Sequence, residues 1–399
     1  MIEQDHSTPK AEIDERIKKL QRRLMAAEID GALILQNTDL FYFSGTIQQS
    51  HLYIPAQGKP LLMVRKSLAR ARSESPLSRI VPLNSPKALM TLIQDSGLKP
   101  PAVMGMELDV LPANNYFYYR KLFPDLDVRD VSLPIRMVRA VKSDYELALI
   151  REAAAFSDQV AEAMPTLLKA GMTEIELAGL VEAQARRLGH QGIVRMRLWG
   201  AEMFYGHLMA GPAAAVPSYL ASPTGGAAVN AAVAQGPSFR KIRRNEPILL
   251  DYVFAWKGYI SDHTRIYTVG RPPQKLVAAH HHMLDLQERI KAMATPGTSA
   301  GRLYSAAMEI AAEKGLSEHF MGAGSDRIQF IGHGVGLELD EFPFIARGQE
   351  TRLEEGMVVA LEPKLIFPGK GVVGIENTHV VSKDGLDQLT HAEQGIVSV

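Results

Sequence analysis

Five dispersed residues have the types and positions that metal-dependent chemistry requires. They are Asp251 in LLDYVF, Asp262 in SDHTR, His333 in GHGVG, Glu362 in ALEP and Glu376 in GIENT. Four are carboxylates in or beside apolar runs, where an acid is unfavourable unless a cation or a partner compensates it. A pair of divalent ions would explain all of them, because two ions about 3.5–4 Å apart need bridging carboxylates and can share an activated hydroxide.

Four carboxylates and one imidazole suit Mn²⁺, Co²⁺, Zn²⁺ or Fe²⁺, and we expect two ions, with Mn²⁺ the expected metal. The chain contains no cysteine, which excludes a thiolate zinc site, a disulfide and a cysteine nucleophile. The alternative is that each acid lies in water at a strand edge or pairs with an arginine. That alternative is the more common for one residue but less economical for all five.

The strand patterns indicate how these residues would meet. Asp251 ends one apolar run and Asp262 lies eleven residues later, so a hairpin through Lys257 and Gly258 would bring them side by side. Side chains alternate along a strand, so His263 is expected to point away from Asp262. Glu362 ends MVVAL, and Glu376 interrupts VVGI and THVV.

Two capping boxes, Ser143 with Glu146 and Thr173 with Glu176, predict the starts of two long helices, the second running to about Leu188. Beyond these helices the chain consists mostly of short apolar strands. We therefore expect residues 139–399 to form an α+β domain, a curved antiparallel sheet covered by helices. The Gly- and Ala-rich segment 222–237 is expected to be a loop, either mobile on the surface or beside the site.

The preceding residues, 1–138, predict an α/β domain. Ile13, Ile17, Leu20 and Leu24 share one helical face, and residues 31–36 and 60–64 resemble short strands. The segment has neither a phosphate-binding glycine loop nor a concentration of His, Asp and Glu, so we expect a scaffold or substrate-shaping role.

Composition excludes several classes of partner. Lys plus Arg and Asp plus Glu both number 44, which gives no reason to expect nucleic acid or an anionic membrane. No run of about 18 apolar residues and no signal-peptide pattern occurs, so we expect a cytoplasmic protein.

These motifs together resemble the pita-bread (M24) metallopeptidase family, which includes Xaa-Pro aminopeptidases, prolidases and methionine aminopeptidases. The similarity extends through KSDYELALIREAA, KAGMTEIELA, SDHTR, GHGVGLE and EEGMVVALEP. The creatinase-like N-terminal domain favours the Xaa-Pro branch. The resemblance implies a dinuclear hydrolase that acts on small peptides through a metal-bridging hydroxide, of aminopeptidase P or prolidase type, and a homodimer.

The resemblance also implies roles for the five residues. Asp251 would bind one metal, Asp262 and Glu376 would bridge, and His333 and Glu362 would bind the other. Glu362 would also accept a proton from the bridging water. Thr264 would lie next to the carboxylates, outside direct contact with the metals, and would help to hold them in place.

The chain departs from the family pattern around the substrate. Asp340 stands where a substrate-binding histidine is usual, seven residues after His333. A second such histidine is replaced by Ser218 or, on the alternative alignment, by the neighbourhood of Ala234 and Gln235. Gly374 and Asn377 flank the I-E pair where the family often has arginine and aspartate.

Other residues are candidates to replace these missing groups. We place Asp340 and His207 with Glu362 as candidate catalytic residues, although His207 could equally be structural. Trp199, Tyr205 and Tyr219 are candidate pocket walls, and the run His280 to His282 is expected to be exposed, because consecutive helical residues cannot converge on one ion.

Three functional hypotheses remain open from the sequence. The first is an Xaa-Pro peptidase. The second keeps the metals but acts on a non-peptide amine or guanidinium compound held by Asp340. The third is a metal-binding protein that has lost catalysis.

Overall fold

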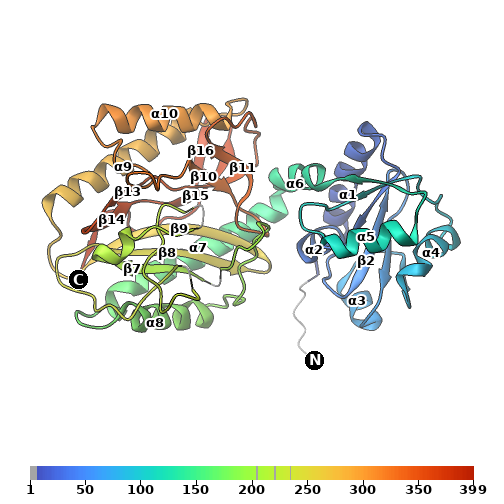
Figure 1. The fold of residues 1–399 in the computed structure, drawn as a ribbon, viewed down its shortest axis with the longest axis horizontal. Helices are drawn as coiled ribbons and strands as arrows, with labels where there is room; N and C mark the ends of the chain where they lie inside the picture. Colours follow the sequence, from blue (N-terminus) through green and yellow to red (C-terminus); the bar gives the residue numbers. More distant parts are fainter. Residues whose placement is uncertain (1–6, 204, 220–221, 234) are drawn as a thin grey trace. The chain divides into compact units, whose positions relative to one another are not determined.

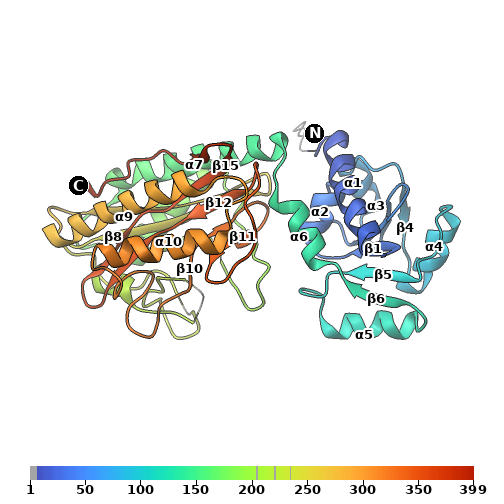
Figure 2. The same ribbon diagram turned by 90° about the horizontal axis from the view of Figure 1, so that it is seen from above.

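The computed structural model describes residues 7–203, 205–219, 222–233 and 235–399. The chain forms two compact units, Met1–Arg139 and Ala140–Val399, whose elements are labelled in Figure 1 and Figure 2. Within the part of the chain that is described, no helix has both the length and the apolar character to cross a membrane.

The first unit is a mixed six-stranded sheet with the strand order β4-β3-β2-β1-β5-β6. All four residues of β1 are buried, so helices cover both faces of the sheet at its centre. Its strands are β1 (Gly31–Ile34), β2 (Ser50–Pro55), β3 (Leu61–Val64), β4 (Ile80–Pro82), β5 (Val103–Met106) and β6 (Asp127–Asp130). Its helices are α1 (Lys10–Ala26), α2 (Asn37–Ser44), α3 (Leu68–Glu74), α4 (Leu89–Asp95), α5 (Ala113–Leu122) and α6 (Ser132–Ala140), the last of which ends at the boundary.

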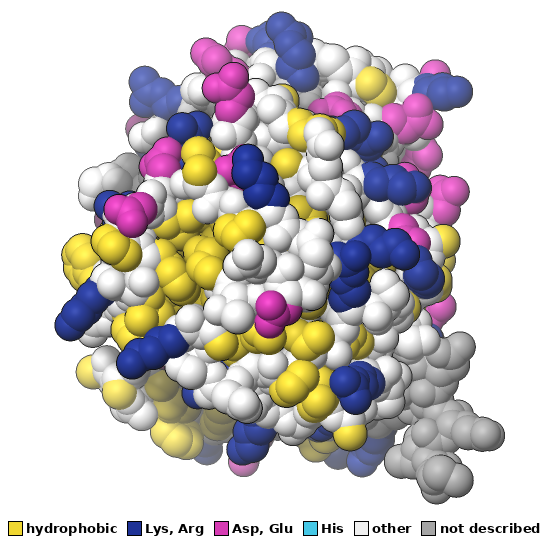
Figure 3. All heavy atoms as spheres, turned by 90° about the vertical axis from the view of Figure 1, so that its right-hand side faces the viewer, with side chains coloured by type: hydrophobic (Ala, Val, Ile, Leu, Met, Phe, Trp, Pro, Cys, Tyr) yellow, Lys and Arg dark blue, Asp and Glu magenta, His cyan; other side chains and the backbone are white. Residues whose placement is uncertain are grey.

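Among the described residues, the one group of His, Asp and Glu side chains close enough to hold a metal ion lies outside this unit. Its exposed large apolar side chains include Phe117, Tyr118 and Leu133. Figure 3 shows a face on which apolar side chains lie among Lys, Arg, Asp and Glu, with no histidine visible.

The second unit carries all the candidate metal ligands. Its strands form a four-stranded sheet β17-β9-β8-β7, a five-stranded sheet β11-β10-β12-β15-β16 and the hairpin β13-β14. The strands are β7 (Gly206–Ala210), β8 (Ile248–Trp256), β9 (Tyr259–Thr268), β10 (Phe330–Gly334), β11 (Glu341–Ala346), β12 (Val358–Leu361), β13 (Lys364–Phe367), β14 (Gly371–Gly374), β15 (Asn377–Ser382), β16 (Gly385–Gln388) and β17 (Val397–Ser398). The Thr264–Glu376 bridge joins β9 to the start of β15, so the sheets adjoin at the candidate ligands.

In the described part of this unit, four α-helices cover these sheets. They are α7 (Asp144–Leu167) and α8 (Glu174–Arg187), which lie near β7–β9, and α9 (Gln274–Met293) and α10 (Ala300–Glu313), which lie over the later strands (Figure 1). Both expected capping boxes are present, with Ser143 and Thr173 each accepting from the backbone amide of the glutamate three residues later. The α+β fold predicted for this part of the chain is confirmed.

The predicted hairpin forms between β8 and β9. Its turn residues, Lys257 and Gly258, have φ of 48° and 91°, the left-handed conformations that suit a tight two-residue turn. Asp251 pairs with Thr264 across the two strands, and Asp262 pairs with Val253. Paired residues point to the same side of a sheet, so Asp251 and Asp262 share one face.

Candidate metal centre

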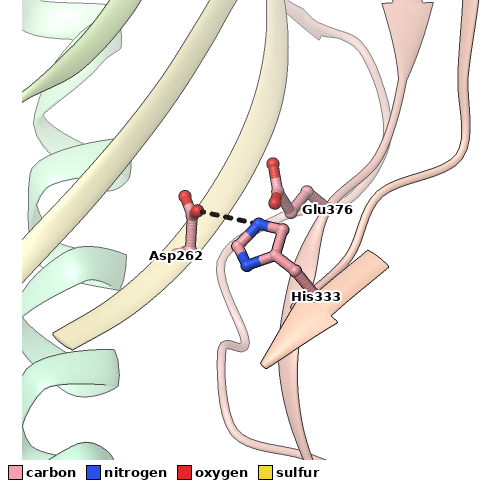
Figure 4. Close-up of side chains that lie close together, drawn as sticks. All are labelled: Asp262, His333 and Glu376. Atoms are coloured by element: carbon pink, nitrogen blue, oxygen red, sulfur yellow. Dashed lines mark ion pairs between the residues drawn. The ribbon is translucent and has the colours of Figure 1, made fainter. Parts of the chain in front are cut away.

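Three of the five predicted ligands converge in the second unit. One ligand atom from each of Asp262, His333 and Glu376 lies within 4.8 Å of the other two, and all three side chains are buried. Figure 4 shows the two carboxylates and the imidazole close together, with Asp262 on β9, His333 on β10 and Glu376 directly before β15. His333 Nε2 lies 3.8 Å from Asp262 Oδ2 and 3.8 Å from Glu362 Oε1. This geometry leaves space for a shared ion.

The other ring nitrogen of His333 faces the backbone. Nδ1 lies 3.1 Å from the carbonyl oxygen of Gly334, to which it donates when it carries the ring proton. That bond selects the tautomer whose Nε2 is free to bind a metal, because a metal-bound imidazole usually donates its other N–H to a carbonyl or carboxylate. Asp340 Oδ1 lies 3.6 Å from the same nitrogen and favours its protonation.

The negative charge of Asp262 has fewer stabilising contacts than that of the other carboxylates. Among the described residues, its Oδ1 atom is buried and has no hydrogen-bond partner. Burial and the nearby carboxylates of Glu376 and Asp251 raise the pKa of Asp262 well above its ordinary value. A buried acid in this state needs either a proton or a cation beside it.

The remaining carboxylates meet a lysine that the sequence patterns did not single out. Lys364 Nζ donates to Asp251 Oδ2 at 3.0 Å, to Glu362 Oε2 at 2.7 Å and to Glu376 Oε2 at 2.9 Å. The lysine side chain is 1% exposed. Burial opposes its charged form, but the three carboxylates raise the pKa of Lys364 well above its usual value.

Lys364 lowers the pKa of two of the acids that it contacts, Asp251 and Glu376. Burial would raise the pKa of Asp251, yet Lys364 and His207 hold it below its ordinary value. Glu376 lies between the two groups, and burial raises its pKa to about 7 even though Lys364 lowers it. The cluster therefore has one side with a built-in counter-charge and one side without.

Two neighbours fix Glu376 in place. Thr264 Oγ1 donates to Glu376 Oε2 at 2.7 Å, which is the supporting role expected for this threonine. The buried Arg265 donates to the carbonyl oxygens of Thr264 and Glu376, at 2.9 Å each, and to Asn377 Oδ1 at 2.9 Å. Asn377, one of the two departures beside the I-E pair, is thus a structural acceptor in this network.

A pocket opens onto the cluster. It is lined by all five predicted ligands and by His207 and Asp340, and its other walls are Met196, Leu198, Trp199, Ala201, Met203, Gly206, Tyr219, Ser222, Gln235, Val253, Phe330 and Leu339. Mostly apolar walls around a few polar groups are typical of a small-molecule site. The loop at 222–237 contributes Ser222 and Gln235, so this segment lies beside the site.

The candidate catalytic residues occupy defined places in this pocket. His207 pairs with Asp251 across β7 and β8, and burial lowers the pKa of its imidazole. Glu362 comes directly after β12. Asp340 has a φ of 62°, a left-handed conformation that is uncommon outside glycine, and such backbone strain is frequent at functional sites.

The other histidines and aromatic residues differ in their relation to the pocket. His263 points away from the metal ligands, as predicted, with Nδ1 2.9 Å from Ser157 Oγ on α7. Trp199 and Tyr219 line the pocket, whereas Tyr205 packs against His190, with ring centroids 4.3 Å apart. Two alignments were possible for the second missing histidine. On the first, Ser218 takes its place, and Ser218 is not among the residues that line the pocket. On the second, Gln235 lines the pocket, and its neighbour Ala234 lies outside the described residues.

One histidine prediction is wrong. His280, expected to be exposed with its two neighbours, is buried, and its Nε2 lies 2.7 Å from the carbonyl oxygen of Gln394. It shares the inward face of α9 with Leu276 and Met283, where helical spacing of three and four residues places side chains together.

Comparison with known proteins agrees with this architecture. Residues 148–383 match the model of metallopeptidase family M24, and residues 16–141 match the creatinase/prolidase N-terminal domain. The chain belongs to metallopeptidase family M24. It is 30% identical to an Xaa-Pro dipeptidase of Lactobacillus delbrueckii subsp. lactis over 72% of this chain and 70% of that protein.

Two further similarities cover almost the whole chain. It is 27% identical to an Xaa-Pro dipeptidase of Pyrococcus horikoshii, over 96% of this chain and 99% of that protein. The crystal structure of the prolidase from Pyrococcus horikoshii superposes with a TM-score of 0.78 at 26% identity, covering 95% of this chain and 99% of that one. The predicted family and fold class, and membership of a hydrolase family, are therefore confirmed.

Membership of family M24 implies divalent metal ions. In this chain one group of the predicted ligands fits such an ion, and the other group does not. Asp262, His333 and Glu376 fit an ion, because their ligand atoms converge and Asp262 Oδ1 has no other partner among the described residues. Asp251 and Glu362 already contact Lys364. A second ion on that side does not fit the arrangement.

The sequence does contain a signal for Lys364. The residue stands two positions after Glu362 in the otherwise apolar run LEPKLIF, and side chains two apart in extended chain face the same way. Lys364 also pairs across β13 and β14 with Gly374, one of the departures noted in the sequence.

Proposed function

We propose that this M24 protein is a metal-dependent hydrolase of small Xaa-Pro substrates, of dipeptidase or aminopeptidase type. The observation that carries the proposal is the convergence of Asp262, His333 and Glu376 beneath a pocket of mostly apolar walls. The names of the relatives point to the same class of substrate.

A divalent ion at this place would supply the hydrolytic chemistry by lowering the pKa of a bound water and polarising the scissile carbonyl. Glu362 is the proton acceptor in this proposal. Its Oε2 is held by Lys364, while its Oε1 faces His333 Nε2 from 3.8 Å on the pocket side. A carboxylate fixed through one oxygen can accept a proton on the other without moving.

The pocket also contains groups suited to a substrate with a charged amino end. Asp340 is a partly exposed carboxylate there, and an ionised carboxylate can accept hydrogen bonds from an ammonium group but donates none. His207, on the Asp251 side, is a second polar group on the wall. We assign Asp340 to the substrate amine and His207 to a neighbouring substrate oxygen or nitrogen.

Asp340 supports a second candidate function as well. A carboxylate in the place of the usual histidine would equally hold a guanidinium or other non-peptide amine, with the metal-ligand cluster unchanged. An untargeted metabolite screen separates the two candidates. Turnover of an amine or guanidinium compound, with no turnover of peptides, would favour this second one.

The test of the main proposal is a panel of Xaa-Pro dipeptides and longer peptides assayed with Mn²⁺ or Co²⁺. We expect metal-dependent release of the first residue, loss of that activity in Asp262→Asn, and poor turnover of N-acetylated substrates, which lack the ammonium group. Asp340→Asn should raise KM more than it lowers kcat, because it weakens binding of the amine.

A protein that binds metal but turns over neither peptides nor metabolites would contradict both enzymatic proposals and leave the non-enzymatic one. A homodimer, a cytoplasmic location and Mn²⁺ as the physiological metal also remain proposals. Each is checked separately, by light scattering, by fractionation and by metal analysis of protein purified from its source.

A further inference from the structure

Lys364 uses all of its hydrogen-bonding capacity on three predicted metal ligands. An ammonium group has three donors, and here each goes to a different carboxylate, those of Asp251, Glu362 and Glu376, at 2.7–3.0 Å. The three carboxylates surround the ammonium nitrogen as ligands surround a metal ion.

An ammonium group and a divalent ion cannot both occupy that position. A transition-metal ion binds carboxylate oxygens at about 2.0–2.2 Å, so an ion shared by these oxygens would lie on top of Nζ or directly against it. The ammonium group therefore occupies the place of an ion that Asp251, Glu362 and Glu376 would bind together.

The fold keeps the lysine in this position. Its side chain is 1% exposed and it lies on β13 opposite Gly374. A Cβ atom at residue 374 would lie 2.7 Å from Lys364 Cα and 2.9 Å from Lys364 Cγ, closer than real Cβ atoms approach. The nearest contact, at 2.5 Å, would be with the carbonyl oxygen of Pro363, so glycine is required here because the two backbones pack closely beside the lysine.

The other side of the cluster lacks any such substitute. Within the described residues, Asp262 Oδ1 is buried without a partner, and Lys364 donates to neither Asp262 nor His333. The Gly334 carbonyl holds the proton of His333 on Nδ1 and leaves Nε2 directed toward Asp262. Asp262 and His333 therefore have no contact with Lys364, whereas Glu376, the third ligand of this side, accepts from it.

We propose that the centre is mononuclear: one divalent ion binds Asp262, His333 and Glu376, and the ammonium group of Lys364 replaces the second ion. The inference rests on the metal centre of the proposed function, but it concerns metal content and is tested without substrate. An inactive protein that binds one ion would contradict the proposed function and leave this inference standing.

The test is the number of Mn²⁺ ions bound per chain after equilibration with excess Mn²⁺ and gel filtration, measured by mass spectrometry and by electron paramagnetic resonance. The wild-type protein should bind one ion and give the spectrum of isolated Mn²⁺. Lys364→Ala should bind two and show the signal of a spin-coupled pair. Asp262→Asn should lose the ion of the wild-type protein.

Lys142 provides the matched control. It is also a buried lysine paired with a carboxylate, Glu341 at 3.2 Å, but it contacts no predicted metal ligand. Lys142→Ala should still bind one ion. Two ions in the wild-type protein, none in it, or one in folded Lys364→Ala would each overturn the inference. If Lys364→Ala does not fold, the wild-type count and spectrum decide alone.

Discussion

The two sides of the carboxylate cluster respond differently to burial. On one side Asp251 and Glu362 lie within 3.0 Å of Lys364 Nζ, and the pKa of Asp251 is held below its ordinary value against the effect of burial. On the other side Asp262 has a buried oxygen without a partner among the described residues, and burial raises its pKa well above the ordinary value.

This difference shows that acid type and position alone do not define a metal ligand. All five predicted ligands come together, yet the protein supplies its own cation to some of them. Asp251 and Glu362 have a fixed positive charge within hydrogen-bond distance, whereas Asp262 Oδ1 has no partner among the described residues. Glu376 lies between the two sides, because it contacts Lys364 and also faces Asp262 and His333. Substitutions on each side of the cluster test that distinction, beginning with the largest expected effect.

Lys364→Met should have the largest effect on stability. Removing one partner of a buried ion pair leaves uncompensated charge and costs about 3–5 kcal/mol, so metal-free Lys364→Met should unfold far more easily than the wild-type protein. Divalent ions should restore much of that loss, by about 2.7 kcal/mol when present at roughly 100 times Kd. Urea unfolding with EDTA and with Mn²⁺ measures both quantities.

Lys142→Met is the control for this prediction. It should also destabilise the protein, because Lys142 Nζ is buried against Glu341 Oε2. Mn²⁺ should not rescue it beyond its effect on the wild-type protein. Equal rescue of both variants would show that Lys364 does not stand in for a metal ion.

The pH dependence of stability should reveal the protonation of Glu376, which lies between the two sides of the cluster. Burial raises the pKa of Glu376 to about 7, against the opposing effect of Lys364. The folded protein therefore holds a proton that the unfolded chain releases between about pH 4.5 and 7. This contribution to stability is complete below the unfolded pKa and is lost as the pH rises through 7.

Glu376→Gln isolates that contribution, because glutamine does not titrate. With EDTA present, the unfolding free energy of the wild-type protein relative to Glu376→Gln should fall by roughly 3 kcal/mol from pH 4.5 to pH 8. Saturating Mn²⁺ should reverse this trend, since metal ligands bind in their deprotonated form. A pH-independent difference in EDTA would contradict the charge assignment.

Much of the local structure on which this cluster depends was predictable from the sequence. Capping boxes at Ser143 and Thr173 and the turn at Lys257 and Gly258 are short-range signals, because each depends on residues within a few positions. The outward direction of His263 followed from strand alternation. The resemblance to family M24 supplied the order of the five candidate ligands.

The role of Lys364 was not predicted, because it depends on contacts between residues far apart in the chain. Its spacing of two from Glu362 is a local signal, but nothing local indicates its contact with Asp251, which lies 113 positions away. The burial of His280 escaped prediction for a similar reason: its acceptor, the Gln394 carbonyl, belongs to a segment 114 residues later. Charge compensation inside a protein is set by tertiary structure, which composition and periodicity do not reveal.

Thr264→Val should give a smaller effect that is confined to the metal. Thr264 Oγ1 donates to Glu376 Oε2 at 2.7 Å, and valine keeps the shape of threonine but loses this bond. Loss of a hydrogen bond that orients a metal ligand typically lowers metal affinity by about 10–100-fold. Glu376 retains its contact with Lys364, so we expect a value near the lower limit, measured by competition with a fluorescent chelator.

Thr268→Val is the matched control on the same strand. Thr268 is equally buried on β9, but its Oγ1 has no hydrogen-bond partner within the described part of the chain, and it is not among the residues lining the pocket. Its substitution should leave Mn²⁺ affinity unchanged. If both variants lose affinity equally, the effect comes from strand packing. If only Thr264→Val loses it, Glu376 is a metal ligand whose orientation depends on Thr264.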